Sequence, residues 1–278
     1  MQNIRKMCGR IILFLIIALI PILAKPAGEV RVIGAGAASM GYCSVALTDN
    51  WSGFNNQAGL AWQTHFSAGV GYENRFLLKE LGNKAAGAVL PFRGGTFALT
   101  LQQFGFSLYN ELKTGIAFGR SFGRHFAAGV HLYYLRIHLA EDYGTRNLVS
   151  FEIGFQYRPD EQWTVGIHFS NPVPVKVNRY QDEHLPVVIR LGLAYRPSSK
   201  FLVTVEAEKD LARKPVIRAG AEYHFAKPAF LRIGVMTNPV EFSFGVGLEP
   251  GKFRIEIAST YHLYLGYSPQ FSLAYLFK

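Results

Sequence analysis

Histidine, serine and cysteine are the residue types of this chain that could carry metal or covalent chemistry. The eight histidines never form the close pair of an H-E-x-x-H motif, and the nucleophile motif G-x-S-x-G is absent. His168 and His262 lie near Ser170 and near Ser259 or Thr260, so a hydrolase of the lipase type is one alternative. Because no motif surrounds these pairs, chance proximity is the simpler account. We therefore predict no enzyme, no metal and no cofactor.

A glycine-rich stretch near the start of the chain could bind the phosphates of a nucleotide. Residues 30–41 read "VRVIGAGAASMG", a loose match to G-x-G-x-x-G/A/S through Gly34 and Gly36. A dinucleotide loop needs a following helix within a βαβ unit and an acidic residue about 20 positions further on. Beyond Trp62 no strand alternates with a helix. The stretch is therefore not interpreted as a nucleotide site.

The elements that must position any site are strands, because hydrophobicity alternates with a period of two from Trp62 onward. In "FLVTVEAE", for example, Phe201, Val203 and Val205 share one face, and Thr204 and Glu206 the other. Fourteen such segments are predicted, about 15 residues apart, which suits membrane strands of about 10 residues. They begin near Gln63, Ala85, Thr96, Glu111, His125, Leu148, Gln162, Val187, Lys200, Val216, Ala229, Glu241, Lys252 and Gln270.

The connections between these segments favour a membrane barrel over a soluble sandwich. Those after even-numbered segments are short, such as "RGG" and "PSS", whereas several after odd-numbered ones are long, such as "NPVPVKVNRYQDEHLP". Outer-membrane barrels have this asymmetry, with both termini in the periplasm. A soluble β-sandwich also alternates, but the less apolar face here is rich in glycine and alanine, which suits a confined lumen. We predict an all-β, 14-stranded antiparallel transmembrane β-barrel.

Charges of both signs recur on the faces that such a barrel would turn inward. Opposite charges fall on neighbouring segments, where cross-strand pairs form, and enclosed charges must be paired or solvated. We predict a charge ladder that braces the wall, with a polar conductance path as the alternative. Its members are Arg190, Glu206, Glu208, Arg218, Glu222, Arg232, Arg254 and Glu256.

The first residues have the composition of a secretory signal peptide. Arg5, Lys6 and Arg10 precede an apolar run over residues 11–23, which is shorter than the about 20 residues that span a bilayer. Removal of residues 1–24 leaves 26 basic and 19 acidic residues without a cluster, so nucleic acid is not a predicted partner. It also leaves Cys43 alone, which excludes an intramolecular disulfide.

The last segment and the aromatic content point to an outer membrane. Aromatic residues make up 14% of the chain, and charged residues 17%. In "QFSLAYLF", Phe271, Leu273, Tyr275 and Phe277 share one face at the C-terminus, before a final lysine. This ending resembles the signal that outer-membrane barrels present to the barrel assembly machinery. Outer-membrane lipids and that machinery are therefore predicted partners.

Two stretches resemble a known family. "GAGAASMGYCSVALTDNWSGFNNQAGLAW" (residues 34–62) is similar to the N-terminal segment of FadL/TodX-like outer-membrane proteins, especially the PorV/PorQ-type barrels of Bacteroidetes-like bacteria. That segment has a G-A-x-A-A-[ML]-G opening and an N-P-A-G-L turn before the first strand. The ending "YHLYLGYSPQFSLAYLF" is also similar to theirs. In this chain Gln57 stands where the family has the proline, which raises the question whether the turn is looser.

The resemblance implies an N-terminal periplasmic or plug segment over residues 25–61 and a barrel over residues 62–278. The plug would form short helical turns inside or across the periplasmic mouth. Its key positions are Gly34, Gly36, Met40, Gly41, Asn55, Asn56, Gln57, Ala58 and Gly59.

Two functions follow from the resemblance. The first is a FadL-like barrel that passes or binds small hydrophobic molecules, with the plug gating entry. The alternative is a PorV/PorQ-like accessory barrel of a type IX-like protein secretion or surface-attachment system, whose partners would be secretion-system proteins. The modest loops and the charge ladder lean toward the alternative.

Overall fold

The computed structural model of this chain describes residues 30–140, 144–177 and 184–277. The predicted signal peptide, its cleavage point and residues 25–29 of the predicted plug lie outside the described residues.

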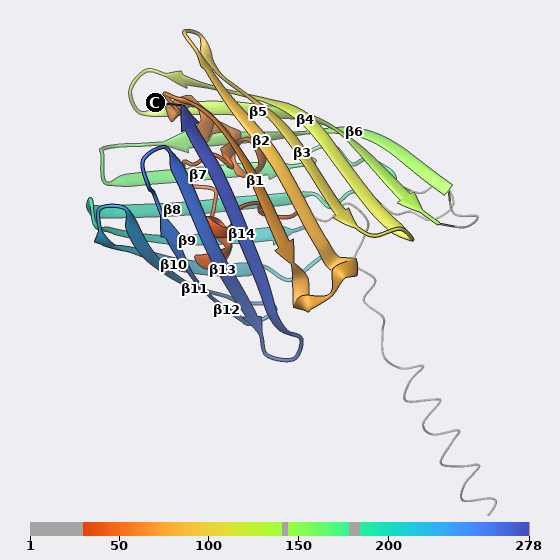
Figure 1. Ribbon diagram of the computed structural model, residues 1–278. Coiled ribbons are helices and arrows are strands. Elements are labelled where there is room, and N and C mark those ends of the chain that lie inside the picture. Colours follow the sequence, from red (N-terminus) through yellow and green to blue (C-terminus); the bar gives the residue numbers. More distant parts are fainter. Residues whose placement is uncertain (1–29, 141–143, 178–183, 278) are drawn as a thin grey trace, which may run out of the picture.

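Fourteen antiparallel strands close into one barrel (Figure 1), which confirms the predicted fold class. Each strand pairs with its neighbours along the chain, and pairing of β1 with β14 closes the sheet. The strands are β1 (Phe66–Asn74), β2 (Gly82–Phe92), β3 (Gly95–Gly105), β4 (Tyr109–Phe122), β5 (Phe126–Leu139), β6 (Gly144–Tyr157), β7 (Trp163–Ser170), β8 (Val188–Ser198), β9 (Phe201–Asp210), β10 (Val216–Ala226), β11 (Ala229–Met236), β12 (Glu241–Leu248), β13 (Phe253–His262) and β14 (Gly266–Phe277).

The observed strands begin within a few residues of the predicted starts. The largest differences are at β6, which begins at Gly144 rather than near Leu148, and at β14, which begins at Gly266 rather than near Gln270. In both hairpins the backbone pairing continues past the end of the apolar alternation, down to Leu139↔Gly144 and His262↔Gly266. Backbone pairing does not need alternating side chains, so the hydrophobic pattern underestimates these strands.

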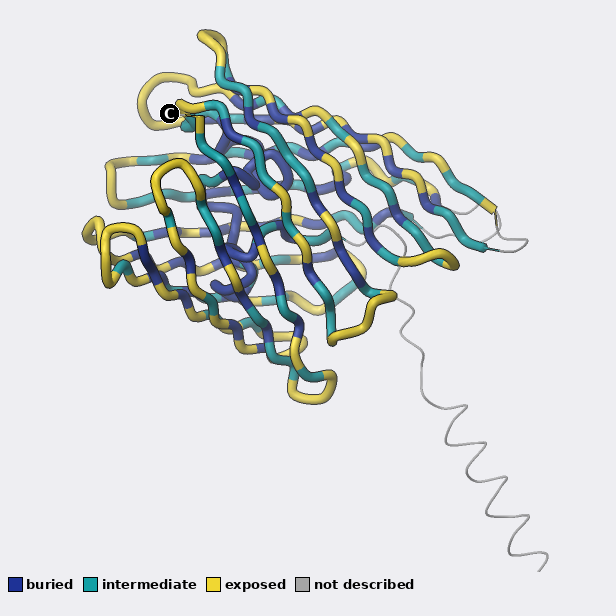
Figure 2. The backbone as a smooth tube through the Cα atoms, viewed as in Figure 1, coloured by how far each residue is buried: buried dark blue, intermediate teal, exposed yellow. Residues whose placement is uncertain are grey.

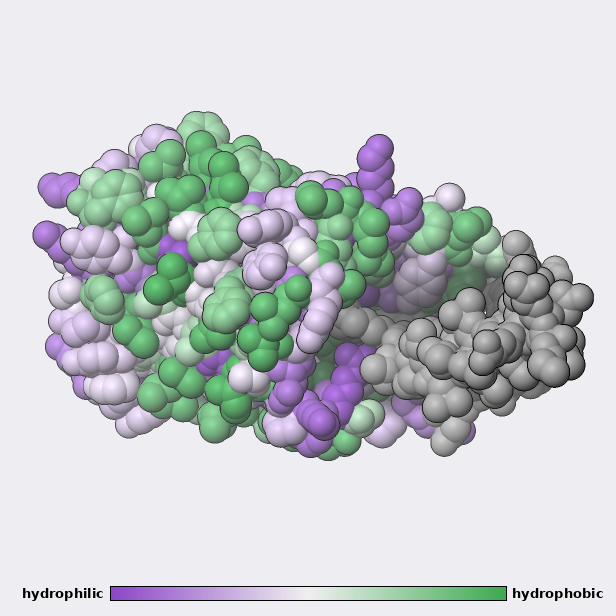
Figure 3. All heavy atoms as spheres, turned by 90° about the horizontal axis from the view of Figure 1, so that it is seen from below, coloured by the Kyte–Doolittle hydropathy of each residue, from purple (hydrophilic) through white to green (hydrophobic). Residues whose placement is uncertain are grey.

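The apolar side chains lie on the outside of the barrel. On β9, Phe201, Val203 and Val205 are 40%, 37% and 46% exposed, whereas Leu202 and Thr204 are buried. The same alternation runs along neighbouring strands (Figure 2), and apolar residues form broad patches over the wall (Figure 3). None of the helices among the described residues is long and apolar enough to cross a membrane. A closed barrel with an apolar outer face is the architecture of bacterial outer-membrane proteins, which confirms the predicted location.

The N-terminal segment lies inside the barrel. It contains the helices α2 (Ala35–Ser39) and α3 (Ser52–Asn55) and the 3-10 helix η1 (Gln57–Trp62). Helix α2 packs against β11 to β14, and η1 against β3 to β6. Two further 3-10 helices, η2 (Arg75–Leu77) and η3 (Lys79–Leu81), connect β1 to β2. We call residues 30–62 the plug.

The plug runs along the lumen from one end of the barrel to the other. Arg31 donates to Glu111 over 2.6 Å, near the start of β4, whereas η1 ends at Trp62 just before β1. Since Phe66 pairs with Phe277, β1 begins at the end where β14 finishes. The first described residues therefore lie at the opposite end from the C-terminus. The predicted mature N-terminus itself lies outside the described residues. We call the end that holds Phe277 the periplasmic end, following the usual orientation of such barrels.

Candidate functional site

The plug backbone lies directly on glycines of the barrel wall. Gly119, Gly129 and Gly154 are cross-strand neighbours on β4, β5 and β6. A Cβ atom at Gly154 would lie 1.9 Å from Asn56 Oδ1, and one at Gly119 would lie 2.3 Å from the carbonyl oxygen of Gln57. Real Cβ contacts are never this short, so only glycine lets the plug approach so closely.

The same close approach continues around the wall. A Cβ atom at Gly166 would lie 2.2 Å from the carbonyl oxygen of Val45, and one at Gly234 would lie 2.1 Å from the amide nitrogen of Gly41. The glycine track, as we call it, comprises Gly119, Gly129, Gly154, Gly166, Gly220 and Gly234. The sequence showed an inward face rich in glycine; the structure shows that the plug is the reason.

The predicted turn residues before β1 bind other parts of the plug and the wall. Asn55 donates to the carbonyl of Ile33 over 2.8 Å and accepts from its amide over 2.9 Å. Asn56 donates to the carbonyl of Val45 over 2.7 Å, and its Oδ1 caps η1 by accepting from the amide of Ala58. Gly59 lies against Ser52, where a Cβ atom would be 2.7 Å from Oγ.

Gln57 is fully buried rather than free to move. Its Nε2 donates to Glu152 Oε2 over 3.2 Å and to the carbonyl of Gly53 over 3.3 Å. A proline at this position could make neither bond, because both come from the side-chain amide. The departure from the family pattern is therefore a polar contact between plug and wall.

The predicted positions earlier in the plug are also enclosed. Gly34 has a φ of +105° and lies against Trp51, and Gly41 has a φ of +67° and donates its amide to Ser243 Oγ over 2.8 Å. Met40 is 2% exposed. A Cβ atom at Gly36 would lie 2.8 Å from Arg232 Nη1 and from Glu256 Oε1, so helix α2 touches the charged side chains of the wall.

Those charged side chains pair across the inner wall, on neighbouring strands or across one intervening strand. Arg232 on β11 donates to Glu222 on β10 over 2.7 Å and to Glu256 on β13 over 2.6 Å. Arg218 lies 3.1 Å from Glu206 and 2.8 Å from Glu208. Arg254 pairs with Glu249.

Two members of this network bind the plug as well as the wall. Arg190 on β8 donates to the carbonyl of Asn55 over 2.9 Å and to Ser44 Oγ over 3.2 Å. Glu206 on β9 accepts from the amides of Ser44 and Val45 over 2.7 and 2.9 Å. Hydrogen bonds from an ionised group are about twice as strong as neutral ones, so these contacts fasten the plug. Sequence reasoning considered bracing between strands or a polar conductance path for these charges, but not attachment of the plug.

A second polar cluster, centred on Glu152, was not predicted. Its carboxylate lies 2.7 Å from Lys113 Nζ, 3.1 Å from His131 Nδ1 and 3.7 Å from His168 Nε2, and it also binds Gln57. The signal was present in "FEIGF", where Glu152 is an inward-phase residue between apolar ones on β6. Within residues 30–140, 144–177 and 184–277, no group of three histidine, cysteine or acidic side chains is placed to hold a metal.

Neither serine–histidine neighbourhood has the geometry of a hydrolase. His168 Nδ1 lies 3.4 Å from Ser170 Oγ but 3.0 Å from Arg190 Nη2. The arginine occupies the nitrogen that a general base would offer to the serine. His262 Nδ1 accepts from the amides of Tyr264 and Leu265 and so caps the turn before β14.

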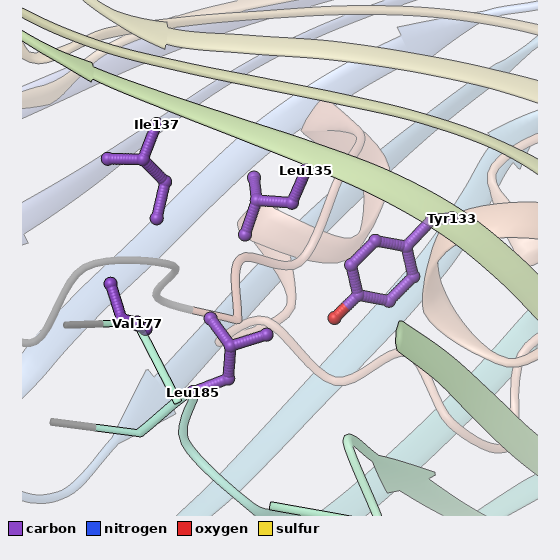
Figure 4. Packing of buried hydrophobic residues seen from close by; sticks show 5 residues of the cluster. All are labelled: Tyr133, Leu135, Ile137, Val177 and Leu185. Atoms are coloured by element: carbon purple, nitrogen blue, oxygen red, sulfur yellow. The ribbon is translucent and has the colours of Figure 1, made fainter. Parts of the chain in front are cut away.

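One inner face of the wall is apolar. Tyr133, Leu135 and Ile137 on β5 are buried and point toward Val177 and Leu185 of the β7–β8 connection (Figure 4). We call these five residues the apolar cluster. The connection can reach them because β7 pairs only with residues 152–157 of β6, which extends beyond it. Sequence reasoning missed this site, since it assigned every apolar face to lipid.

The four predicted assembly-signal residues lie on one face of β14. Phe271 and Phe277 are exposed, and the ring of Phe277 lies 4.3 Å from that of Phe66 on β1. The ring of Tyr275 lies 5.0 Å from that of Phe253 on β13, and Leu273 is half-buried. The terminal aromatic residues thus flank the pairing that closes the barrel.

The plug separates a cavity at each end of the lumen. The cavity of about 280 Å³ at the end that holds Arg31 is lined by Tyr42, Glu208 and Arg218, among others. The cavity of about 460 Å³ at the periplasmic end is lined by Trp62 and several arginines. Between them the plug residues Cys43, Ala58 and Leu60 are fully buried, and burial raises the pKa of the Cys43 thiol.

The fold is shared with solved bacterial transport proteins. No protein-family model matches the chain, and no curated protein sequence matches it. The Ralstonia pickettii toluene transporter TbuX superimposes with a TM-score of 0.68 at 10% identity, covering 88% of this chain and 97% of that chain. A Pseudomonas aeruginosa FadL homologue gives 0.69 at 10% identity over 89% and 99%. The Pseudomonas putida toluene transporter TodX gives 0.66 at 12% identity over 90% and 99%. The likeness establishes a common FadL-like barrel fold.

Proposed function

We propose that this chain binds small hydrophobic molecules and passes them across the outer membrane, without covalent chemistry. The observation that carries the proposal is the apolar cluster, which places Leu135 and Ile137 on the inner side of a wall whose other inward side chains are mainly polar. The interior of a transmembrane barrel is usually polar, so an apolar inner face needs a reason. Val177 and Leu185 of the β7–β8 connection cover this face in the structure, and a ligand without hydrogen-bonding groups would take their place against it. Two proteins of this fold are toluene transporters.

Passage along this lumen requires a shift of the plug, because the plug fills the space between the two end cavities. The contact between Ala46 and Gly192 offers a way to prevent that shift. The Ala46 Cβ atom lies 3.6 Å from the position that a Cβ atom would take at Gly192. This separation falls within the range of about 3.5–4.5 Å found in disulfides.

The test uses the double variant Ala46→Cys/Gly192→Cys, with Cys43→Ala to remove the native thiol, in a strain that lacks the wild-type gene. With the disulfide formed, uptake of radiolabelled toluene should fall at least tenfold below that of the Cys43→Ala parent, and a reductant should restore it. The single variant Ala46→Cys in the same background is the control. Wild-type uptake through a fully cross-linked barrel would contradict gating by the plug, and unchanged uptake in the deletion strain would contradict transport itself.

The accessory barrel of a secretion system is the second candidate, and the charged contacts between plug and wall favour it. Arg190 and Glu206 together make four hydrogen bonds to the plug, which suits a lumen that stays closed. In this role the barrel would act through contacts at its rim. The same deletion strain separates the two functions: loss of protein export with normal toluene uptake would contradict the transporter proposal. Export through the predicted signal peptide and recognition of β14 by the assembly machinery belong to both proposals.

A further inference from the structure

Three arginines line the cavity at the periplasmic end of the lumen. Arg124 lies in the β4–β5 turn, Arg158 follows β6, and Arg196 belongs to β8. The cavity has a volume of about 460 Å³ and is bounded on one side by the plug residues Thr48 and Trp62. This volume lies within the range of about 300–1,000 Å³ typical of small-molecule sites.

Arg158 is held in the cavity without a carboxylate partner. Its guanidinium lies 4.4 Å from the centre of the Trp62 ring, and Nη2 donates to Thr48 Oγ1 over 2.6 Å. Among the described residues its Nε atom is buried with no hydrogen-bond partner, and no carboxylate lies within 4.0 Å of its nitrogens. Burial first, and then the positive charge of Arg196, lower the pKa of Arg158 to about 10.

Two of the three acidic groups nearby have closer partners than the cavity arginines. Asp160 Oδ1 accepts from the amides of Gln162 and Trp163 over 2.8 and 2.9 Å, so it shapes the β6–β7 turn. Glu222 lies 4.0 Å from Arg196 but 2.7 Å from Arg232, its closer partner. Glu161 also lines the cavity, and it is exposed at the turn.

The rest of the lining combines the polar residues His125, Gln162 and Thr164 with a group of apolar side chains. Ala46 and Leu47 of the plug face the same cavity as Ala194 on β8 and Leu202 on β9. A site with two cations that repel each other at one side and apolar side chains at the other matches a ligand with an anionic group and an apolar body. A carboxylate can accept two parallel hydrogen bonds from one guanidinium, and it would relieve the repulsion between the arginines.

We infer that this periplasmic cavity binds a small organic carboxylate, with its anionic group on Arg158 and Arg196 and its apolar body against Leu47 and Leu202. The inference does not rest on the proposed transport of neutral hydrocarbons. It concerns a different cavity and a different ligand chemistry, and it is tested by binding rather than by uptake.

Trp62 provides the readout, because it lies beneath Arg158. The full chain, folded in detergent micelles, is titrated with 4-bromobenzoate, whose bromine quenches tryptophan fluorescence on contact. Arg158→Gln and Arg196→Gln should each weaken binding at least tenfold, and Arg158→Lys should retain part of the affinity. The matched control is Arg93→Gln, which removes an exposed arginine from the β2–β3 turn at the same end of the barrel but outside the cavity.

Two further measurements decide whether the site has the proposed chemistry. The neutral 4-bromobenzamide should bind the wild-type protein at least tenfold more weakly, and Trp62→Phe should abolish most of the quenching. Heat-modifiable gel migration confirms that each variant is folded. Wild-type affinity in folded Arg158→Gln, equal binding of the amide, or full quenching in Trp62→Phe would overturn the inference. So would inorganic phosphate that competes as well as benzoate, because the apolar body would then contribute nothing.

Discussion

On the β8–β13 side of the lumen, arginine and glutamate side chains bind the plug in addition to the glycines Gly220 and Gly234, whereas on the β4–β6 side the plug backbone lies mainly on glycines. Arg190 and Glu206 form hydrogen bonds to plug atoms over 2.7–3.2 Å. Gly129 and Gly154 leave no room for even a methyl group beside Gln57 and Asn56. Both sides therefore hold the plug by close approach of the backbone, and the β8–β13 side adds charged hydrogen bonds to the plug backbone.

The comparison shows that substitutions can disrupt the packing between plug and wall in two different ways. Enclosed charges are stable only in balanced sets, so removing one partner leaves another charge buried and unpaired. A glycine surface carries no charge to unbalance, but any added atom forces the plug away from the wall. Substitutions on the two sides should therefore differ in size and in what rescues them.

The largest effect is expected on the charged side, from Arg232→Met. This change leaves Glu222 and Glu256 without their shared partner, which lies within 2.7 Å of both. Breaking a buried pair in this way costs about 3–5 kcal/mol. The free energy of unfolding, measured by urea titration of the barrel in lipid vesicles, should fall by that amount.

A triple variant tests why Arg232→Met lowers the free energy of unfolding. Addition of Glu222→Gln and Glu256→Gln to Arg232→Met should recover most of the lost stability, since no buried charge is then left unpaired. If the triple variant is no more stable than Arg232→Met alone, packing by the arginine stem, rather than charge balance, explains the loss.

A smaller effect is expected on the glycine side, from Gly154→Ala. The added methyl group would lie 1.9 Å from Asn56 Oδ1, so the capped turn before β1 must shift. Overpacking of this kind costs about 1–3 kcal/mol in the same urea titration. Gly94→Ala is the control, because nothing lies within 4 Å of its added Cβ atom. Equal stability of the two variants would contradict the close seating of the plug.

The smallest effect is a pH dependence at Asp49, a plug residue near the charged side. Burial first, and then the negative charge of Glu256, raise the pKa of its carboxyl group to about 6, above the value of about 3.9 in an unfolded chain. The folded protein therefore binds this proton more tightly, and the contribution of Asp49 to stability falls as the pH rises from about 4 to about 6.

The variant Asp49→Asn isolates this contribution, since an asparagine oxygen can still accept from the amide of Trp51, as Asp49 does over 2.8 Å. Two pKa units correspond to about 3 kcal/mol, but Asp49 is only partly buried, so at pH 7.5 the variant should be more stable than the wild type by about 1–2 kcal/mol. Near pH 4 the difference should vanish. Urea titrations at both pH values measure it. A difference that is the same at both would show that the charge of Asp49 is not its cause.

The strands and the outward face were predictable from the sequence because they depend on a local pattern. A period of two assigns Phe201 and Val203 to one face without knowledge of any other strand. The inward charges Arg232 and Glu256 followed from the same phase. What remained hidden was which inward residues meet the plug: Glu152 looked like an isolated acid, and its contacts with Lys113 and Gln57 bring together distant parts of the chain.

The apolar cluster is a second feature that the sequence pattern did not reveal. Leu135 and Ile137 have the composition of a lipid-facing surface, yet they point inward and are covered by the β7–β8 connection. Only the unequal lengths of β6 and β7 create the space into which that connection folds. Alternation alone does not show where one strand of a pair ends early.

By itself the sequence determined that this chain forms a closed antiparallel barrel for a membrane, because strand number, alternation and turn lengths are repeated along the chain. The tertiary structure decided what fills that barrel: a plug that crosses its whole length, seated on glycines around the wall and fastened by charged side chains on the β8–β13 side. The physical reason is the separation in sequence between the residues that determine each feature. Strand patterns are set by neighbours in the chain, whereas the stretch "FNNQAGLAW" is positioned by Glu152 and Arg190, which are distant in sequence and adjacent only after the barrel closes.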